Sequence, residues 1–179
     1  MHSLFGSLLE IKWVSNEGPS CTTAAALAAL GALGATDLPD LRDATSALAG
    51  SPLAAPALRD YVSMPGRRAP LDKRIETLAR AHGLVIKAES GVVMPGWPLR
   101  PPATGALIVH LAWGQERPGH YGSWGWRPLR PETYSTGGHS VVLAAVEGAE
   151  WIVSDPNHEC LQTWPRPGIA TARTLLLPG

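Results

Sequence analysis

The chain has 179 residues, 45% of them hydrophobic and 17% charged, which is enough apolar material to bury a core. Lysine and arginine together number 15, and aspartate and glutamate also number 15, so the net charge gives no sign of nucleic acid or an anionic membrane as a partner. We therefore expect a single folded domain, residues 1–179, that binds neither.

We expect no secretory signal in this sequence. No basic region at the N-terminus is followed by an apolar core and a cleavage site. The longest apolar run, at 24–35, is too short for a membrane-spanning helix. We expect a cytoplasmic protein with no role coupled to peptide export within the same chain, and leave secretion as an effector open. The two cysteines are interpreted as reduced thiols.

The first half of the chain is predicted to be helical, after a short strand or extended lead-in at 8–14. A helix follows at 20–33, with Ser20 as its cap and Gly34 as its stop. Because this helix carries no charged residue, we expect it to be buried on most sides. Further helices are predicted at 39–49, 56–62 and 70–81.

The second half is predicted to form strands, at 84–88, 106–113, 139–146, 150–154 and 171–177. The third and fourth of these are separated by Glu147-Gly148-Ala149, which is typical of a tight hairpin turn. Helices followed by antiparallel strands indicate an α+β fold.

Cys21 stands at the predicted start of the buried helix. The first-turn amides and the helix dipole favour negative charge there, so the pKa of the thiol is expected to fall. A thiolate beside an imidazolium is the nucleophile of many cysteine enzymes. The alternative is that Cys21 is a small buried hydrophobic residue, and Cys160 is interpreted as a bystander thiol.

His139 follows two glycines and opens a predicted strand, so we expect it at a sheet edge with close approach of another backbone. Asp155 ends the next strand, and antiparallel pairing would bring the two side chains together. An aspartate there accepts the imidazole N–H and fixes the tautomer that a Cys–His pair needs. Asn157 is the second candidate for that role. The alternatives are a hydrogen-bonded structural histidine and a turn aspartate before proline.

Together, a cysteine at a helix start, a Gly-His before an apolar strand and a downstream Asp-Pro resemble papain-like peptidases. The resemblance is closest to the bacteriocin-processing branch, the double-glycine leader peptidases, with Cys21, His139 and Asp155-Pro156 as the matching residues. It implies an α+β papain-like fold in which an N-terminal helix carrying the nucleophile packs on a C-terminal antiparallel sheet. It also implies that no cofactor is needed.

The chain departs from that family at two positions. The family places a glutamine six residues before the cysteine, where it helps to bind the oxyanion, but Ser15 stands here and Asn16 is its neighbour. The predicted oxyanion hole therefore consists of the Asn16 side chain and the backbone N–H of Cys21, and losing such a donor costs about 3 kcal/mol. Glycine usually follows the cysteine, whereas Thr22 follows it here.

The resemblance implies a cysteine-dependent hydrolase that cleaves a peptide or amide bond through a Cys-His-Asp triad and a thioester, with a peptide or protein as substrate. One alternative is an acyltransferase or deamidase of natural-product or toxin type that uses the same site. The other is a catalytically inactive papain-like module that binds a partner.

The Trp- and Pro-rich stretch 94–131 is interpreted as a loop that either lines the substrate, binds a protein partner or covers the edge of the core. Trp124, Trp126 and Gly138 are the candidate residues of a substrate cleft. The metal-ligating types near the C-terminus show no recognised metal spacing, so no metal is expected. These residues are His139, Asp155, His158 and Cys160.

Overall fold

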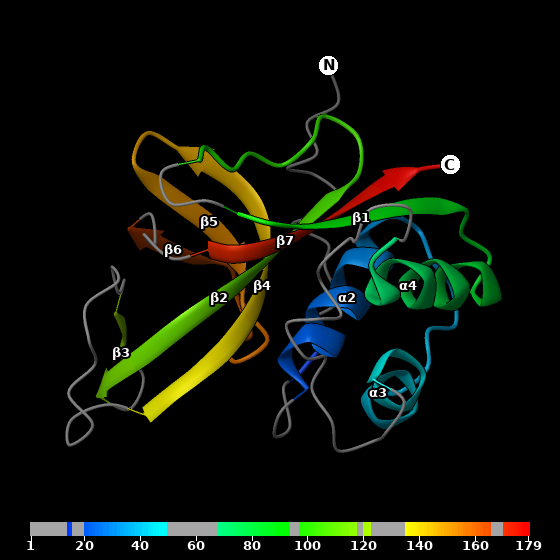
Figure 1. Ribbon diagram of the computed structural model, residues 1–179, viewed down its shortest axis with the longest axis horizontal. Helices are drawn as coiled ribbons and strands as arrows, with labels where there is room; N and C mark the ends of the chain where they lie inside the picture. The colour runs from blue at the N-terminus through cyan, green and yellow to red at the C-terminus, as the bar shows by residue number, and fades with distance from the viewer. Residues whose placement is uncertain are drawn as a thin grey trace.

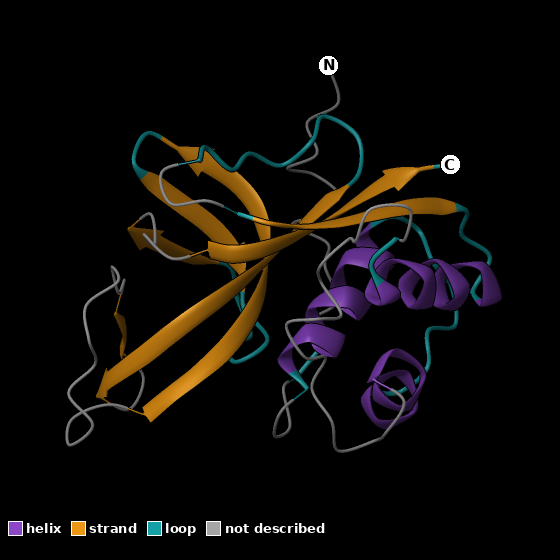
Figure 2. Cartoon of the chain, viewed as in Figure 1, coloured by secondary structure: helices purple, strands orange, loops and turns teal. Residues whose placement is uncertain are grey.

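The structure, a computed structural model, describes residues 14–15, 20–49, 68–93, 97–117, 120–122, 135–165 and 170–179. The helices in this part of the chain are α2 (Cys21–Ala32), α3 (Leu41–Ala49) and α4 (Pro70–Ala81). The strands are β1 (Ile86–Val92), β2 (Ala106–Arg117), β3 (His120–Gly122), β4 (Ser135–Glu147), β5 (Glu150–Ser154), β6 (Gln162–Pro165) and β7 (Ala170–Pro178). The helices gather on one side of the sheet, which confirms the predicted α+β class (Figures 1 and 2).

The strands form one antiparallel sheet in the order β1-β7-β2-β4-β5-β6, with β3 added beside β2. β4 therefore lies inside the sheet, between β2 and β5. His139 itself lies where β4 pairs with β2 alone among the described strands, because the ladder with β5 begins at Val142, and this agrees with the predicted sheet edge. The glycines before it do not end the strand, because Gly137 and Gly138 continue the ladder opposite Trp113 and Ala112 of β2.

Apolar residues fill both faces of the sheet. The face toward the helices includes Ile108, Val142 and Leu176, which pack in one cluster with residues of all three helices. The opposite face belongs to a second cluster that contains Val109 and Trp151. Alternation along each strand sends neighbouring side chains to different clusters, as a period of two residues requires.

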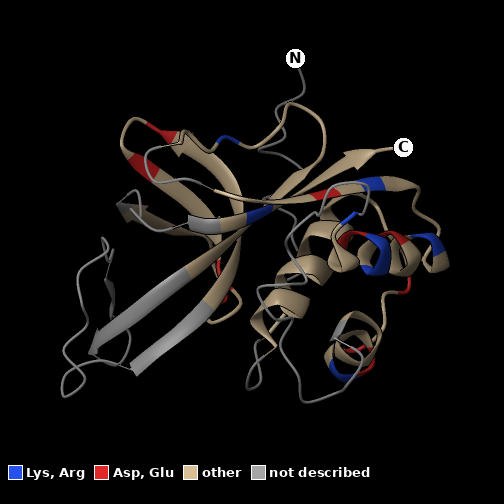
Figure 3. Ribbon diagram, in the orientation of Figure 1, with Lys and Arg blue, Asp and Glu red and all other residues tan. Residues whose placement is uncertain are grey.

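Helix α2 packs on the centre of the sheet, against β4 and β2. Every residue from Cys21 to Leu30 is buried, which confirms the prediction drawn from its lack of charge. Figure 3 shows α2 without a charged residue, beside the charged α3 and α4. The helix ends before Gly34, whose φ of +98° is the left-handed conformation that glycine adopts most easily. No helix among the described residues is both long and apolar enough to span a membrane.

Local signals explain the ends of the other helices. Asp40 accepts a hydrogen bond of 2.8 Å from the backbone N–H of Asp43, so it caps α3, and the helix begins at Leu41 instead of residue 39. Helix α4 has the predicted bounds, with Pro70 in its first turn and Gly83 after its end at a φ of +77°. The predicted segments 8–14 and 56–62 lie wholly or mainly outside the described residues.

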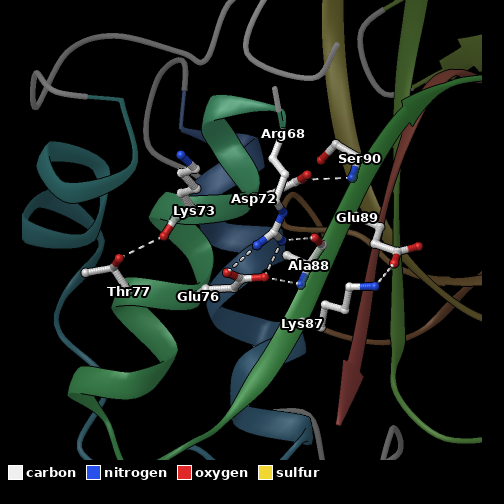
Figure 4. A network of polar contacts seen from close by, with 9 residues as sticks. All are labelled: Arg68, Asp72, Lys73, Glu76, Thr77, Lys87, Ala88, Glu89 and Ser90. Atoms are coloured by element: carbon white, nitrogen blue, oxygen red, sulfur yellow. Dashed lines mark hydrogen bonds and ion pairs between the residues drawn. The ribbon is translucent and has the colours of Figure 1, made fainter. Parts of the chain in front are cut away.

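Side chains of α4 cover the outer edge of β1 (Figure 4). The backbone N–H of Ala88 donates to Glu76 at 2.8 Å, and the N–H of Ser90 donates to Asp72 at 2.8 Å. Arg68 pairs with Glu76 and donates to the carbonyl oxygen of Ala88 at 2.6 Å. These side chains satisfy backbone groups that an edge strand would otherwise offer to another chain.

Three strand predictions need correction. The first strand covers Ile86–Val92 instead of 84–88, because the α4 side chains hold its later residues against the edge. Strands β3 and β6 were not predicted, because such short segments have too little alternation to detect. The stretch 94–131 is not one loop, since β2 and β3 occupy much of it.

Gly105 is a position where the fold requires glycine. Its φ is +116°, and a Cβ atom there would lie 2.1 Å from the carbonyl oxygen of Leu176 in β7. We expect Gly105→Ala to lower the free energy of unfolding by about 3 kcal/mol, because backbone strain adds to a clash with a main-chain atom. Urea unfolding checks this against Gly91→Ala, where nothing lies within 4 Å and little change is expected. Equal losses in the two variants would contradict the assignment.

Candidate active site

Cys21 is the first residue of α2, and the residue is 8% exposed. Ser20 occupies the cap position, but its hydroxyl does not cap the helix, so the expected role of Ser20 is wrong. The backbone N–H of Thr22 instead donates to the sulfur of Cys21. The thiol therefore accepts a first-turn N–H that a capping side chain would normally satisfy.

His139 and Asp155 form the second contact of the site. The Nε2 atom of His139 lies 2.7 Å from Oδ1 of Asp155, and the two residues are 4% and 0% exposed. Asp155 directly follows β5, which pairs with β4 in an antiparallel ladder. The predicted route to this contact, through neighbouring strands, is therefore what the structure shows.

A tight turn holds the carboxylate in place. The backbone N–H of His158 donates to the carbonyl oxygen of Asp155 at 3.0 Å, with Pro156 at the second position, where its fixed φ suits a turn. The backbone N–H of Asn157 donates to Oδ1 of Asp155 at 2.9 Å. The aspartate is thus both the turn residue of the structural interpretation and the hydrogen-bond partner of His139.

Burial and mutual contact determine the charges of the pair. Burial raises the pKa of the Cys21 thiol, but the hydrogen bond and positive charge of His139, with the N–H groups of Ser140 and Thr22, outweigh it and lower the pKa overall. Burial lowers the pKa of His139, but its hydrogen bonds to Asp155 and Cys21 and their negative charges raise it to about 9. Opposite shifts favour a thiolate beside an imidazolium.

The ring of His139 has one nitrogen for each neighbour. Nε2 bonds Asp155, which leaves Nδ1 as the nitrogen available to the thiol of Cys21. An imidazolium donates from both nitrogens, so it can serve both partners at once. The three side chains come from α2, β4 and the turn after β5. Such a row can hold a nucleophile in its charged form and keep a proton ready for a leaving group.

Of the other residues predicted for the site, the structure describes Asn157 and Gly138. The side chain of Asn157 is exposed, and its contact with Asp155 is made by its backbone N–H, so Asp155 and not Asn157 bonds the imidazole. Gly138 lies in β4 opposite Ala112 and directly precedes His139. Asn16, Trp124 and Trp126 lie outside the described residues, so the side-chain donor of the oxyanion hole and the aromatic wall of the cleft stay predictions.

Neither cysteine is in a disulfide, and Cys160 is exposed. Its sulfur accepts a hydrogen bond of 3.3 Å from the side chain of Gln162. Across the described ranges, no group of three or more histidine, cysteine and acidic side chains is arranged to hold a metal ion. Of the residues considered for such a cluster, His158 approaches Oδ2 of Asp155 at 3.7 Å.

The sequence did not identify Thr22 and Ser140 as members of the site. Each directly follows one member of the Cys–His pair, and each directs its backbone N–H at the sulfur of Cys21. The replacement of the usual glycine by Thr22 was visible in the sequence. The contact of the Thr22 hydroxyl with the Ser140 hydroxyl could not be inferred from the sequence, because the two residues are 118 positions apart.

Comparison with known proteins identifies the fold. No protein-family model and no curated protein matches the sequence. The peptidase domain of Streptococcus ComA, a bi-functional ABC transporter involved in a quorum sensing pathway, is similar in structure with a TM-score of 0.52 at 11% identity, covering 95% of this chain and 100% of that one. A C39-like peptidase from Bacillus anthracis gives 0.48 at 11% identity, covering 94% and 95% of the two chains. The chain therefore has the papain-like peptidase fold, and its own buried helix, which begins at Cys21, packs on an antiparallel sheet.

Proposed function

We propose that the chain is a cysteine-dependent hydrolase that cleaves a peptide or another amide bond. The observation that supports this most strongly is the buried row of thiol, imidazole and carboxylate formed by Cys21, His139 and Asp155. The opposite pKa shifts of the first two residues match what a thiolate nucleophile requires. The fold shared with a peptidase domain supports a peptide as the substrate class.

The first half of the reaction forms a thioester. The thiolate sulfur of Cys21 attacks the carbonyl carbon of the amide, and the carbonyl oxygen takes up the negative charge. The carbon–nitrogen bond then breaks, and the imidazolium of His139 gives its proton to the leaving amine. The acyl group remains on the sulfur, and His139 is left neutral.

The second half releases the acid. Neutral His139 takes a proton from water, whose oxygen attacks the thioester carbon, and the carbon–sulfur bond breaks to return the thiolate. Asp155 keeps the ring oriented in both halves of the reaction, because its carboxylate accepts a hydrogen bond from the Nε2–H group of His139. The backbone N–H of Cys21 and the Asn16 side chain are the proposed donors to the oxyanion. A free thiol is kept reduced in the cytoplasm, where we propose that the protein acts.

A peptide library read by mass spectrometry tests the reaction. The wild-type protein is expected to cleave a subset of peptides and to show a transient acyl adduct on Cys21. The Cys21→Ala variant should do neither, whereas Cys160→Ala, which removes the exposed thiol, should behave as wild type. Transfer of the acyl group to an added amine in place of water would indicate the acyltransferase alternative.

Alkylation tests the site without a substrate. At pH 6 we expect iodoacetamide to label Cys21 faster than Cys160, because hydrogen bonding to His139 and that residue's charge favour the thiolate of Cys21. Peptide mapping after short exposure measures both rates in one sample. Slower labelling of Cys21 than of Cys160 at this pH would count against the proposal and favour an inactive binding module.

A further inference from the structure

A second contact lies beside the Cys–His pair and joins the same two elements. Thr22 follows Cys21 in α2, and Ser140 follows His139 in β4. Their hydroxyl oxygens lie 2.8 Å apart, and the two residues are 3% and 2% exposed. Hydrogen bonds in both pairs therefore connect the start of the helix to the strand.

The hydroxyl pair begins a longer buried row, which we call the cross-sheet chain. Its members, in order of contact, are Thr22, Ser140, His110, Thr174, Ser90 and Asp72. The Nδ1 atom of His110 lies 2.8 Å from the Ser140 hydroxyl, and its Nε2 atom lies 2.9 Å from the Thr174 hydroxyl. The chain crosses β4, β2, β7 and β1 and ends on α4.

Strand register explains how the row forms. His110 is directly opposite Ser140 in the β2–β4 ladder, and Ser90 is directly opposite Thr174 in the β1–β7 ladder. His110 and Thr174 are diagonal neighbours, since His110 pairs with Ala172. Side chains in these relations lie on the same face of a sheet within reach of one another.

Asp72, the acidic end of the cross-sheet chain, determines which atom donates in each hydrogen bond. Burial raises the pKa of Asp72, whereas hydrogen bonds from Ser90 and the charge of Arg68 oppose that rise. In its ionised form the carboxylate only accepts, and both the hydroxyl and the backbone N–H of Ser90 donate to it (Figure 4 draws the backbone bond). The single hydroxyl proton of Ser90 is then used, so the Thr174 hydroxyl donates to Ser90 and accepts from Nε2 of His110.

The same rule applies from His110 to the active site. Burial lowers the pKa of His110 to about 3, so the ring is neutral and has one donor and one acceptor. With Nε2 donating, Nδ1 accepts from the Ser140 hydroxyl. The Ser140 oxygen therefore accepts from Thr22. In every hydrogen bond of the cross-sheet chain, the donor lies on the α2 side and the acceptor on the α4 side.

We propose that Thr22, Ser140 and His110 are positioning residues that hold the start of α2 against β4 so that the sulfur of Cys21 meets the ring of His139. This inference rests on the proposed function. Thr22 and Ser140 each also supply a backbone N–H to the sulfur. Movement of α2 against β4 would therefore change two contacts of the thiol at once, those with Ser140 and His139.

The composition of α2 explains why hydrogen bonds are needed to fix its position on the sheet. The buried face of the helix consists largely of alanine, with three residues of this type in a row at 24–26. Burial of apolar surface is non-directional, so small similar side chains define the position of a helix along a sheet poorly. Hydrogen bonds are short and directional, and a fully satisfied buried network favours one arrangement over its neighbours.

The test compares Thr22→Val with Thr22→Ser in the otherwise intact protein carrying Cys160→Ala. Valine has nearly the shape of threonine but cannot hydrogen-bond, whereas serine can. We expect Thr22→Val to move the pH midpoint of Cys21 alkylation upward and to reduce the rate at pH 6 by about tenfold, the equivalent of one buried hydrogen bond. Thr22→Ser should restore both values toward wild type.

Two further variants separate positioning from general loss of stability. Thr23→Val alters the next residue, a buried threonine whose hydroxyl has no hydrogen-bond partner among the described residues. It should raise the melting temperature and leave the midpoint unchanged. Thr174→Val removes the link beyond His110 and should move the midpoint upward by less than Thr22→Val, with Thr174→Ser restoring it.

The possible results are distinguishable. If Cys21 of the wild type titrates no lower than an exposed thiol, the proposed function fails before any variant is compared. If the wild-type midpoint is low but folded Thr22→Val keeps it, the positioning role is wrong. An unchanged midpoint in Thr174→Val would overturn the part assigned to His110. Should Thr22→Val not fold, Thr22→Ala takes its place with the same expectation.

Discussion

Replacing His139 with alanine is expected to lower amide hydrolysis at pH 7 by about 10²–10⁴-fold, the usual contribution of a positioned acid–base group. The variant loses both the proposed proton donor for the leaving amine and the positive charge beside the thiol. Burial would still raise the pKa of Cys21, while its main opposing partner would be gone. The pH midpoint of Cys21 alkylation should therefore move upward, and a pH series of labelling rates measures the shift.

The sign of the pH dependence follows from the two shifts. Hydrolysis by the wild type should increase as the pH rises through the lowered pKa of Cys21 and fall as it rises through about 9, where His139 loses its proton. The folded pKa of His139 lies above its ordinary value of 6.5, so its contribution to stability is complete below that pH and is lost as the pH rises toward about 9.

The control for the His139→Ala experiment is His82→Ala. His82 is a half-buried histidine at the end of α4, and its backbone carbonyl, which accepts from Thr36, survives the change. Hydrolysis and labelling should stay close to wild type. If His139→Ala keeps the wild-type alkylation midpoint, the thiolate–imidazolium pair does not exist and the mechanism must be abandoned.

Replacing Asp155 with alanine is expected to destabilise the protein by about 3–5 kcal/mol, the cost of removing one partner of a buried charged pair. The carboxylate is fully buried and accepts from both His139 and the backbone N–H of Asn157. Without it, the pKa of His139 should fall, because burial disfavours the charged ring and a major opposing contact is lost. Unfolding in urea at pH 7 measures the stability change.

Asp155→Asn separates the charge from the hydrogen bond. The amide oxygen can still accept the Nε2 proton of His139, but it carries no negative charge. We expect a smaller loss of stability than in Asp155→Ala, with a clear upward shift of the Cys21 alkylation midpoint. A midpoint equal to wild type in both variants would show that the carboxylate is a turn residue only, as the structural interpretation of Asp155 proposed.

Local chemistry is the part of the fold that the sequence predicted best. Pro70 and Gly83 mark the ends of α4, and Gly148 marks the hairpin between β4 and β5, because proline and glycine restrict or extend backbone freedom at their own positions. The absence of charged side chains in α2 likewise predicted its burial. Side-chain chemistry within a few residues decides each of these features.

Long-range pairing is where the sequence was insufficient. The glycines before His139 suggested the start of a strand, yet β4 begins at Ser135 and pairs with β2, because the choice of neighbours depends on segments far along the chain. The extent of β1 depends on acidic residues of α4 that satisfy its outer backbone groups. Neither relation has a signature within a short window of sequence.

The amino-acid sequence alone determined which residues are proposed to carry the chemistry: a cysteine at a helix start, a histidine before an apolar strand and an aspartate before proline. Only the tertiary structure decided that Thr22 and Ser140 meet beside them and that His110 extends the contact across the sheet. The physical reason is that a side chain's type is local, whereas the direction of a buried hydrogen bond depends on strand register and helix placement.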